Sequence, residues 1–236
     1  MSHLILIRHG QSIWNLENRF TGWVDVELSE NGRKEAYKAG HLIKELNIDF
    51  GKIYTSYLKR ANETLDIVLN IINLSNKEII KAWELNERHY GNLTGLNKDE
   101  MKIKLSEQKV HQLRRSWDIP PEKLSKDSPY HPLNNEIYKN IPKYLIPNTE
   151  SLKDTYERVL PYYKKNILPN LNSNVLISAH GNSIRALCKY LFNLDNDIIS
   201  KLEIPTGNPL IIELKNDKVK SAEYLDQSRS KDLIIF

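Results

Sequence analysis

The chain is poor in cysteine and has no long apolar segment. Cys188 is the single cysteine among 236 residues, so no disulfide can form within one copy, and a reducing cytoplasm is the expected location. No apolar run approaches the roughly 18–20 residues needed to cross a bilayer. The apolar stretch 4–7 is too short for a secretory signal. We therefore expect a cytoplasmic protein that has no membrane partner.

The chain also has no block of like charge and no nucleotide-binding motif. Its 34 basic and 30 acidic side chains leave a net charge of +4, and the basic residues are scattered. This pattern argues against a nucleic-acid partner and suits a small anionic substrate. Neither a Walker A motif nor a Gly-x-Gly-x-x-Gly motif is present, so a nucleotide would lack its usual cradle.

Short apolar runs alternate with amphipathic stretches along most of the chain. We predict strands at 3–8, 52–56, 78–85, 174–179 and 209–214, and helices at 30–47, 58–73, 97–115, from 151 onward and 182–194. Alternating strands and helices indicate an α/β fold with a mostly parallel sheet flanked by helices on both faces. Residues 1–236 are interpreted as a single domain. The proline-rich region lies in a lid-like insertion of about 97–150, and a C-terminal tail covers about 226–236.

Two places share one local design. His9-Gly10 and His180-Gly181 each end an apolar strand and precede a polar residue that we expect to open a helix. Ligands of parallel α/β sheets bind at the carboxyl ends of strands. The N-terminus of a helix stabilises an anion there by about 0.3–1 kcal/mol. One such tripeptide is a weak signal, but its repetition indicates two imidazoles beside one phosphate.

Cations surround these turns in the sequence. Arg8 precedes His9, and Arg60 opens the helix after the second strand; a guanidinium binds phosphate through two parallel hydrogen bonds. Glu87 follows the third strand, where a carboxylate among imidazoles suits general acid–base work. Taken alone, Glu87 fits a solvated loop equally well. The helix 97–115 carries a further group of cations, which suits either a solvated face or a grip on a second anionic group: Lys98, Arg114 and Arg115.

A zinc site is the main alternative from the same residues. His9, His180 and Glu87 could supply three ligands. Two helix N-termini aimed at this site would give it positive potential, which favours phosphate and disfavours a divalent cation. We therefore expect no metal.

Longer motifs then point to a family. The chain resembles the 2,3-bisphosphoglycerate-dependent phosphoglycerate mutases of the histidine phosphatase superfamily, from residue 4 to about 225. The resemblance rests on several motifs in family order: LIRHGQSIWN (6–15), NRFTGW (18–23), YTSYLKRA (54–61), LNERHYG (85–91), GLNK (95–98), Arg114-Arg115, AHGNSIRA (179–186) and IPTG (204–207).

The resemblance implies interconversion of 3-phosphoglycerate and 2-phosphoglycerate in glycolysis and gluconeogenesis. It implies priming by 2,3-bisphosphoglycerate and no metal. His9 would form the phosphohistidine, Glu87 would relay protons, and His180 with Arg8 and Arg60 would stabilise the transferring phosphoryl group. The resemblance assigns substrate binding to a larger set: Gly10, Ser12, Asn15, Thr21, Gly22, Arg88, Tyr90, Lys98, Arg114, Arg115, Gly181 and Asn182. Ser12 favours the glycolytic mutase over the related bisphosphoglycerate mutase. Whether the chain forms a homo-oligomer is left open.

The chain departs from the family pattern near its end. Asp226 stands where the family usually has glycine, and the stretch 128–132 is shorter and lacks the usual glycine. An anionic Asp226 close to phosphate would be repelled, so we predict a leakier site with measurable hydrolysis of 2,3-bisphosphoglycerate. The apolar end 233–236 is the alternative cover. Two rivals remain: a phosphomonoesterase on the same fold, and an inactive phospho-ligand-binding module, against which the presence of His9, Glu87 and His180 argues.

Overall fold

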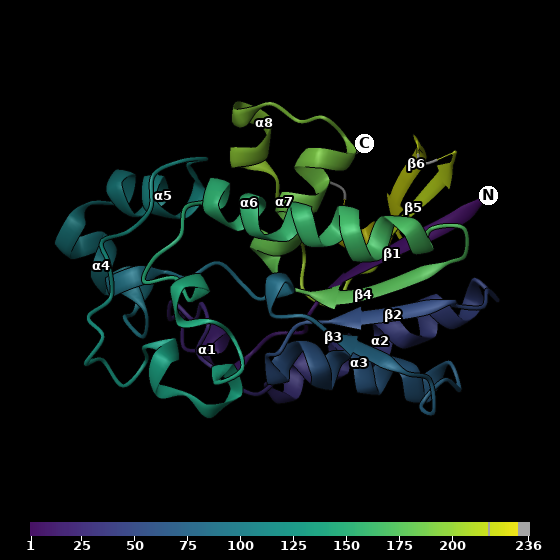
Figure 1. Cartoon of the computed structure of the whole chain (residues 1–236), viewed down its shortest axis with the longest axis horizontal. Helices are drawn as coiled ribbons and strands as arrows, with labels where there is room; N and C mark the ends of the chain where they lie inside the picture. Colours follow the sequence, from purple (N-terminus) through teal and green to yellow (C-terminus); the bar gives the residue numbers. More distant parts are fainter. Residues whose placement is uncertain (217, 231–236) are drawn as a thin grey trace.

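The computed structural model describes residues 1–216 and 218–230, and a six-stranded sheet forms its centre (Figure 1). The strands are β1 (Ser2–Arg8), β2 (Lys52–Thr55), β3 (Ile79–Lys81), β4 (Val175–Ala179), β5 (Leu210–Lys215) and β6 (Lys218–Tyr224). They lie in the order β3-β2-β4-β1-β5-β6. The first four are parallel, whereas β5 and β6 pair antiparallel at one edge. The predicted mostly parallel α/β sheet is confirmed.

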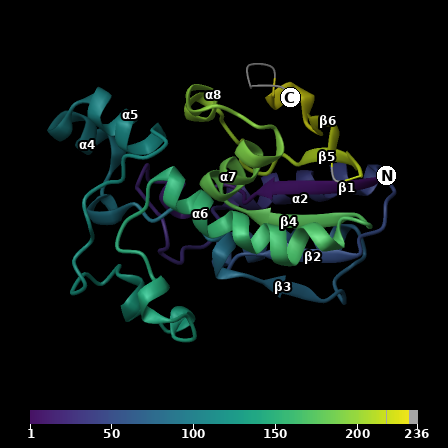
Figure 2. The same ribbon diagram turned by 45° about the horizontal axis from the view of Figure 1, so that its top comes forward.

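Helices cover both faces of the sheet because the side chains of its strands alternate. In β1, Leu4 and Leu6 pack with α6 (Leu152–Tyr162) and α7 (Gly181–Leu191), whereas Ile5 and Ile7 pack with α2 (Glu30–Glu45) and α3 (Lys59–Ile71). Figure 2 shows the two helix layers on either side of β1 and β4. All four side chains are buried.

The insertion lies beyond the carboxyl ends of the central strands (Figure 1). It contains α4 (Lys98–Leu105), α5 (Glu107–Arg115) and three short 3-10 turns at Pro132–Asn134, Glu136–Tyr138 and Lys143–Leu145. The predicted single helix 97–115 is broken at Ser106, whose φ is +80°. The Ser106 hydroxyl instead accepts a hydrogen bond from Lys109 N and caps α5.

Several smaller elements differ from the prediction. β3 covers three residues, and Trp83–Leu85 forms a 3-10 turn rather than extending the strand. The prediction gave no bounds for α1 (Ile13–Leu16) and omitted α8 (Asn196–Lys201) and β6, because short helices and polar edge strands leave a weak periodic pattern. Among residues 1–216 and 218–230, none of the helices has the length and apolar character required to traverse a bilayer.

Candidate active site

The carboxyl ends of β1, β2 and β4 bring the predicted histidines together. Arg8 of β1 pairs with Ala179 of β4, so the residues that follow, His9 and His180, emerge side by side. Their ring centroids lie 5.0 Å apart at an interplanar angle of 60°. Both side chains are buried. The predicted convergence of two imidazoles is therefore what the fold produces.

One nitrogen of His9 is oriented for nucleophilic attack. His9 Nδ1 lies 2.7 Å from the carbonyl oxygen of Gly10, which makes Nδ1 the protonated nitrogen. Nε2 is then the acceptor, and Arg60 Nε donates to it at 3.2 Å. Burial, together with the charges of Arg60 and Arg8, lowers the pKa of His9 well below 6.5. A neutral ring with its lone pair at Nε2 is the form that a phosphoryl-accepting histidine requires.

The loop after His9 is held by direct backbone packing. A Cβ on Gly10 would lie 2.1 Å from the carbonyl oxygen of Gly32 in α2, so no side chain fits there. Ser29 N and Oγ donate to Gln11 O, at 2.9 and 3.1 Å, and Glu35 Oε2 accepts from Gln11 N at 2.7 Å. The loop is thus fixed to the start of α2, and His9 is held with it.

The second turn is built differently. His180 precedes α7 directly, and its ring lies against the end of β2, where Ser56 Oγ is 2.7 Å from Nε2. The pKa of His180 is also well below 6.5, because of burial and the charges of Arg60 and Arg8. Nδ1 is buried and has no hydrogen-bond partner within the described part of the chain. A buried polar atom of this kind normally has a hydrogen-bond partner, so Nδ1 could bind a ligand oxygen.

A helix opens after both turns, as predicted, but the two helices differ in length. After His180 the helix α7 begins at Gly181 and runs to Leu191, whereas after His9 only the four-residue α1 forms, capped by Ser12. The long helix α2 starts later, at Glu30. Arg8 and Arg60 add positive charge beside His9.

Glu87 is oriented by residues from two segments. Its Oε1 accepts hydrogen bonds from Arg88 N at 2.7 Å, Asn182 Nδ2 at 2.8 Å and Asn182 N at 3.2 Å. Asn182 Oδ1 in turn accepts from Arg185 Nη1 at 2.8 Å, which fixes the orientation of the amide. The Glu87 carboxylate is therefore held at the N-terminus of α7.

Two hollows open at this end of the sheet and share part of their lining. Both are lined by Arg8, Glu87, Tyr90 and Arg114. The hollow nearer the nucleophile adds His9, Asn15, Arg19, Phe20, Thr21, Gly22, Arg60 and Lys98. The other adds Arg115, Gly181, Asn182, Arg185, Glu203 and Ile204. Most of the predicted site residues thus line one cleft, with cations at both ends.

Three predicted binding residues lie behind this surface instead. Gly10 packs against Gly32, and Ser12 is fully buried as the N-cap of α1. Arg88 is also fully buried; it donates to the carbonyl oxygens of Leu113 at 3.2 Å and Arg114 at 3.0 Å. Arg88 Nε and Nη1 are buried without a hydrogen-bond partner among residues 1–216 and 218–230. None of the three residues lines either hollow, and their direct contact with substrate stays a prediction.

Arg115 lines the cleft but already has an acidic partner. It forms an ion pair with Glu203, and its Nη1 donates to Leu202 O at 3.4 Å. Arg114, by contrast, lines both hollows. Of the two adjacent arginines, Arg115 is therefore already paired with an acidic side chain.

The field in the cleft is positive. Burial would raise the pKa of Tyr90, but Arg88 and Arg114 outweigh it and the pKa is lowered. The pKa of Lys98 is lowered by burial, although Tyr90 opposes this. Arg8 Nε and Thr21 Oγ1 are buried without a hydrogen-bond partner among residues 1–216 and 218–230. Unpaired donors in a positive field fit an anion with several oxygens. No group of three or more His, Cys, Asp or Glu in those ranges is arranged to hold a metal ion.

Several residues in or next to the cleft were missed from the sequence. Ser56 follows β2 directly, so the strand-end position that pointed to His9 also pointed to Ser56. Arg185 lies three residues after Asn182 in α7, a spacing that places both on one helix face. Arg19 and Phe20 also line the first hollow.

Asp226 lies outside both hollows. Its Oδ2 is 2.5 Å from Lys38 Nζ of α2, and its Oδ1 accepts from Ser228 Oγ at 2.6 Å. Burial acts to raise the pKa of Asp226, but these two hydrogen bonds and the charge of Lys38 lower it. Asp226 therefore does not face the cleft as a free anion, because Lys38 is paired with it; the hydrolysis of 2,3-bisphosphoglycerate stays a prediction. The alternative cover, residues 233–236, lies outside the described residues.

Comparisons with known proteins agree with this geometry. Residues 4–131 and 126–227 match the profile of the histidine phosphatase superfamily (branch 1), and the chain belongs to this superfamily. It is 60% identical over 239 residues to the 2,3-bisphosphoglycerate-dependent phosphoglycerate mutase of Pelagibacter ubique, covering 100% of both chains. The mutase of the same description from Hydrogenobaculum sp. is 50% identical over 228 residues, covering 95% of this chain and 92% of the relative.

Solved structures share the fold at lower identity. Bacillus stearothermophilus YhfR matches with a TM-score of 0.68 and 24% identity over 93% of this chain and 95% of its own. A mycobacterial glucosyl-3-phosphoglycerate phosphatase matches with a TM-score of 0.67 and 20% identity over 95% and 97%. At these identities the likeness is one of fold.

Proposed function

We propose that this enzyme interconverts 3-phosphoglycerate and 2-phosphoglycerate and is primed by 2,3-bisphosphoglycerate. The observation that carries this assignment is full-length identity of up to 60% to enzymes of that name. The site supplies the chemistry that such a reaction needs: a neutral imidazole, a carboxylate and several guanidinium groups in one cleft. The reaction belongs to glycolysis and, in the opposite direction, to gluconeogenesis.

His9 is proposed as the nucleophile. The lone pair of Nε2 forms a bond to the phosphorus of 2,3-bisphosphoglycerate, and the bond from that phosphorus to the glycerate oxygen breaks. Arg8, Arg60 and His180 surround the transferring group and stabilise its charge. Phosphoryl transfer depends mainly on positioning and charge stabilisation of this kind. The Nδ1–H bond to Gly10 O keeps the reactive nitrogen in place.

Glu87 is proposed to move the proton. As the phosphoryl group leaves the glycerate, Glu87 donates a proton to the leaving oxygen. When the group returns to a different hydroxyl, the carboxylate takes the proton of that hydroxyl. The hydrogen bonds from Asn182 and Arg88 hold the carboxylate at the cleft shared by both hollows.

The remaining cleft residues are proposed to bind the phosphate and carboxylate of the substrate. This set comprises Asn15, Thr21, Gly22, Tyr90, Lys98, Arg114, Arg115, Gly181 and Asn182. We also propose a single domain over 1–236 and a cytoplasmic location. Metal independence stays a prediction, and the oligomeric state stays open.

An assay coupled to the consumption of 2-phosphoglycerate tests this function. With 3-phosphoglycerate as substrate, we expect turnover that requires catalytic amounts of 2,3-bisphosphoglycerate and that survives EDTA. Release of inorganic phosphate without formation of 2-phosphoglycerate would favour the phosphomonoesterase. Activity that is lost with chelator and restored by manganese would contradict the metal-free reaction.

A further inference from the structure

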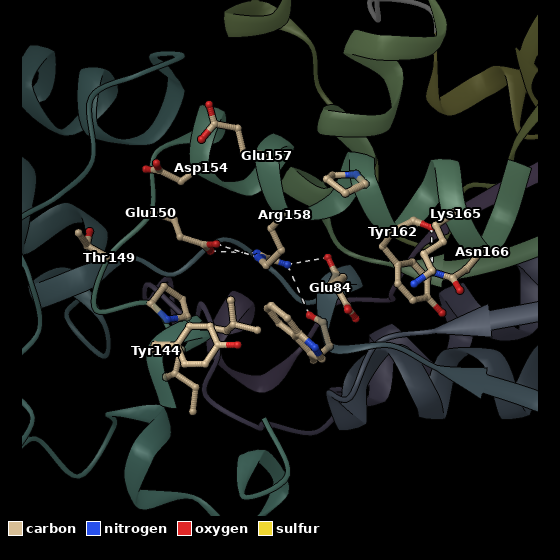
Figure 3. Close-up of a pocket in the computed structure, with 15 residues that line it drawn as sticks. Glu84, Tyr144, Thr149, Glu150, Asp154, Glu157, Arg158, Tyr162, Lys165 and Asn166 are labelled. Atoms are coloured by element: carbon tan, nitrogen blue, oxygen red, sulfur yellow. Dashed lines mark hydrogen bonds and ion pairs between the residues drawn. The ribbon is translucent and has the colours of Figure 1, made fainter. Parts of the chain in front are cut away.

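A buried ion pair lies behind the loop that carries Glu87. Arg158 of α6 contacts Glu150, which precedes the α6 cap Ser151, through two parallel bonds: Nε to Oε1 at 2.8 Å and Nη2 to Oε2 at 2.9 Å. The two side chains are 7% and 4% exposed. Figure 3 shows the pair, with Glu84 beside it. An ion pair buried to this degree is retained only when its remaining polar groups are also satisfied.

The remaining donors of Arg158 reach the main chain around Glu87. Nη1 donates to the carbonyl oxygens of Glu84 at 2.6 Å and Asn86 at 3.3 Å. Nη2 donates to the carbonyl oxygen of Glu87 itself at 3.3 Å. One guanidinium therefore holds the loop at the general acid–base residue and on its N-terminal side.

Glu150 holds the other side of the same loop. Its Oε2 accepts a hydrogen bond from His89 N at 2.8 Å, two residues after Glu87. The backbone N of Glu150 donates to His89 O at 2.9 Å. Because the pair contacts main-chain atoms on both sides of Glu87, it restricts where the Glu87 Cα can lie.

Neither member of the pair lines the cleft. Both instead line a separate hollow on the far side of the loop, together with Tyr144, Thr149 and Tyr162 (Figure 3). The Glu87 carboxylate must also meet Asn182 of α7, and that contact requires its main chain to be in place. The pair therefore affects the site through the position of Glu87, without contact with substrate.

We infer that Arg158 and Glu150 are positioning residues for proton transfer by Glu87. This inference rests on the proposed function. Misplacement of a reacting group by about 1 Å can cost on the order of a hundredfold in rate. The pair should therefore affect kcat, whereas substrate binding depends mainly on cations that the pair does not contact.

A double-mutant cycle in the full chain tests the inference. Arg158→Lys keeps the charge but loses the two-pronged contact, and Glu150→Gln keeps the shape but loses the charge. Each is made alone and combined with Glu87→Gln, and kcat and KM for 3-phosphoglycerate are measured. We expect each single variant to lower kcat by about ten- to a hundredfold with KM changed less than about threefold. In the Glu87→Gln background the further loss should be less than about threefold, because the group being positioned is already disabled.

Phe50→Leu provides the control for destabilisation. Phe50 is buried before β2, at the opposite end of the sheet. If it lowers the melting temperature as much as Arg158→Lys but leaves kcat unchanged, a stability loss is excluded as the cause. If Arg158→Lys and Glu150→Gln each lower kcat by the same factor in the otherwise unaltered enzyme and in the Glu87→Gln background, the positioning role is wrong. The proposed function would still stand. If the unaltered enzyme lacks primed mutase activity, the proposed function fails, and this inference fails with it.

Discussion

The two His-Gly turns look alike in sequence and are held in different ways. The turn at His9 ends in a loop whose backbone touches the backbone of Gly32, and its Gln11 is bound by Ser29 and Glu35. The turn at His180 continues straight into α7, and a Cβ on Gly181 would meet Arg8 Nε at an ordinary 3.5 Å. One glycine is required by packing, and the other is not.

In the proposed mechanism, this difference separates two roles. The first turn presents a nucleophile that must not move, and α2 holds its loop from behind. The second turn presents a helix N-terminus and a histidine whose Nδ1 is buried without a partner in the described ranges. Under that proposal, identical dipeptides would serve attack on phosphorus in one place and binding of its oxygens in the other.

Replacing each histidine gives the largest contrast. His9→Ala should abolish mutase activity and all labelling by 2,3-bisphosphoglycerate, because no other side chain presents the reactive nitrogen. His180→Ala should still take label, but slowly. The label should be acid-labile and alkali-stable, as expected of a phosphohistidine, and radiolabelled 2,3-bisphosphoglycerate followed by acid and alkali treatment measures it. Label that persists in His9→Ala would reassign the nucleophile.

Glu87→Gln tests the carboxylate that the second turn holds. A general acid–base group contributes about 10²–10⁴-fold, so kcat should fall by that order while KM stays broadly intact. Steady-state kinetics in both directions provides the measurement. A change confined to KM would make Glu87 a binding residue.

The two glycines give a contrast in stability. Gly10→Ala places a methyl against the Gly32 carbonyl, and overpacking of this kind costs about 1–3 kcal/mol or more. Gly181→Ala meets only ordinary contact and should change the free energy of unfolding by less than about 1 kcal/mol. Urea unfolding of both variants tests this. Equal destabilisation would remove the distinction drawn between the turns.

Arg114 and Arg115 sharpen the comparison at the far end of the cleft. A charge-assisted hydrogen bond contributes about 1.5–3 kcal/mol, so each Ala variant should lower kcat/KM by roughly ten- to a hundredfold. We expect Arg114→Ala to have the larger effect, because Arg115 is shared with Glu203. Glu203→Gln is the matched control, because it removes the acidic partner and keeps Arg115. Unchanged kcat/KM in both variants would mean that Arg114 and Arg115 belong to a solvated face and do not bind substrate.

The protonation of the two histidines should appear as a pH dependence of stability. Both have a folded pKa well below 6.5, so between these values the unfolded chain binds protons that the folded chain does not. Stability should be complete above pH 6.5 and fall as the pH is lowered, by at most about 1.4 kcal/mol per pH unit for each histidine. His180→Gln should reduce this slope. A slope unchanged in that variant would mean that His180 is not buried neutral.

Much of the fold was predictable because strand alternation and helix periodicity are local. The reactive and charged residues at predicted strand ends also indicated that Arg8, His9 and His180 lie close together. What local patterns could not provide was the partner of each polar group. Arg158 looks like any arginine on an amphipathic helix, and Asp226 looks like a free anion until Lys38 of α2 is placed beside it. The break at Ser106 was missed because serine rarely adopts a positive φ.

The buried Arg60 lowers the stability of the folded protein. Its guanidinium is 1% exposed, and burial lowers its pKa, which means that the fold disfavours the charge it needs. An anion in the cleft relieves this penalty, so inorganic phosphate should raise the melting temperature with its concentration. In the cell, dissolved phosphate would then stabilise the folded form of this chain.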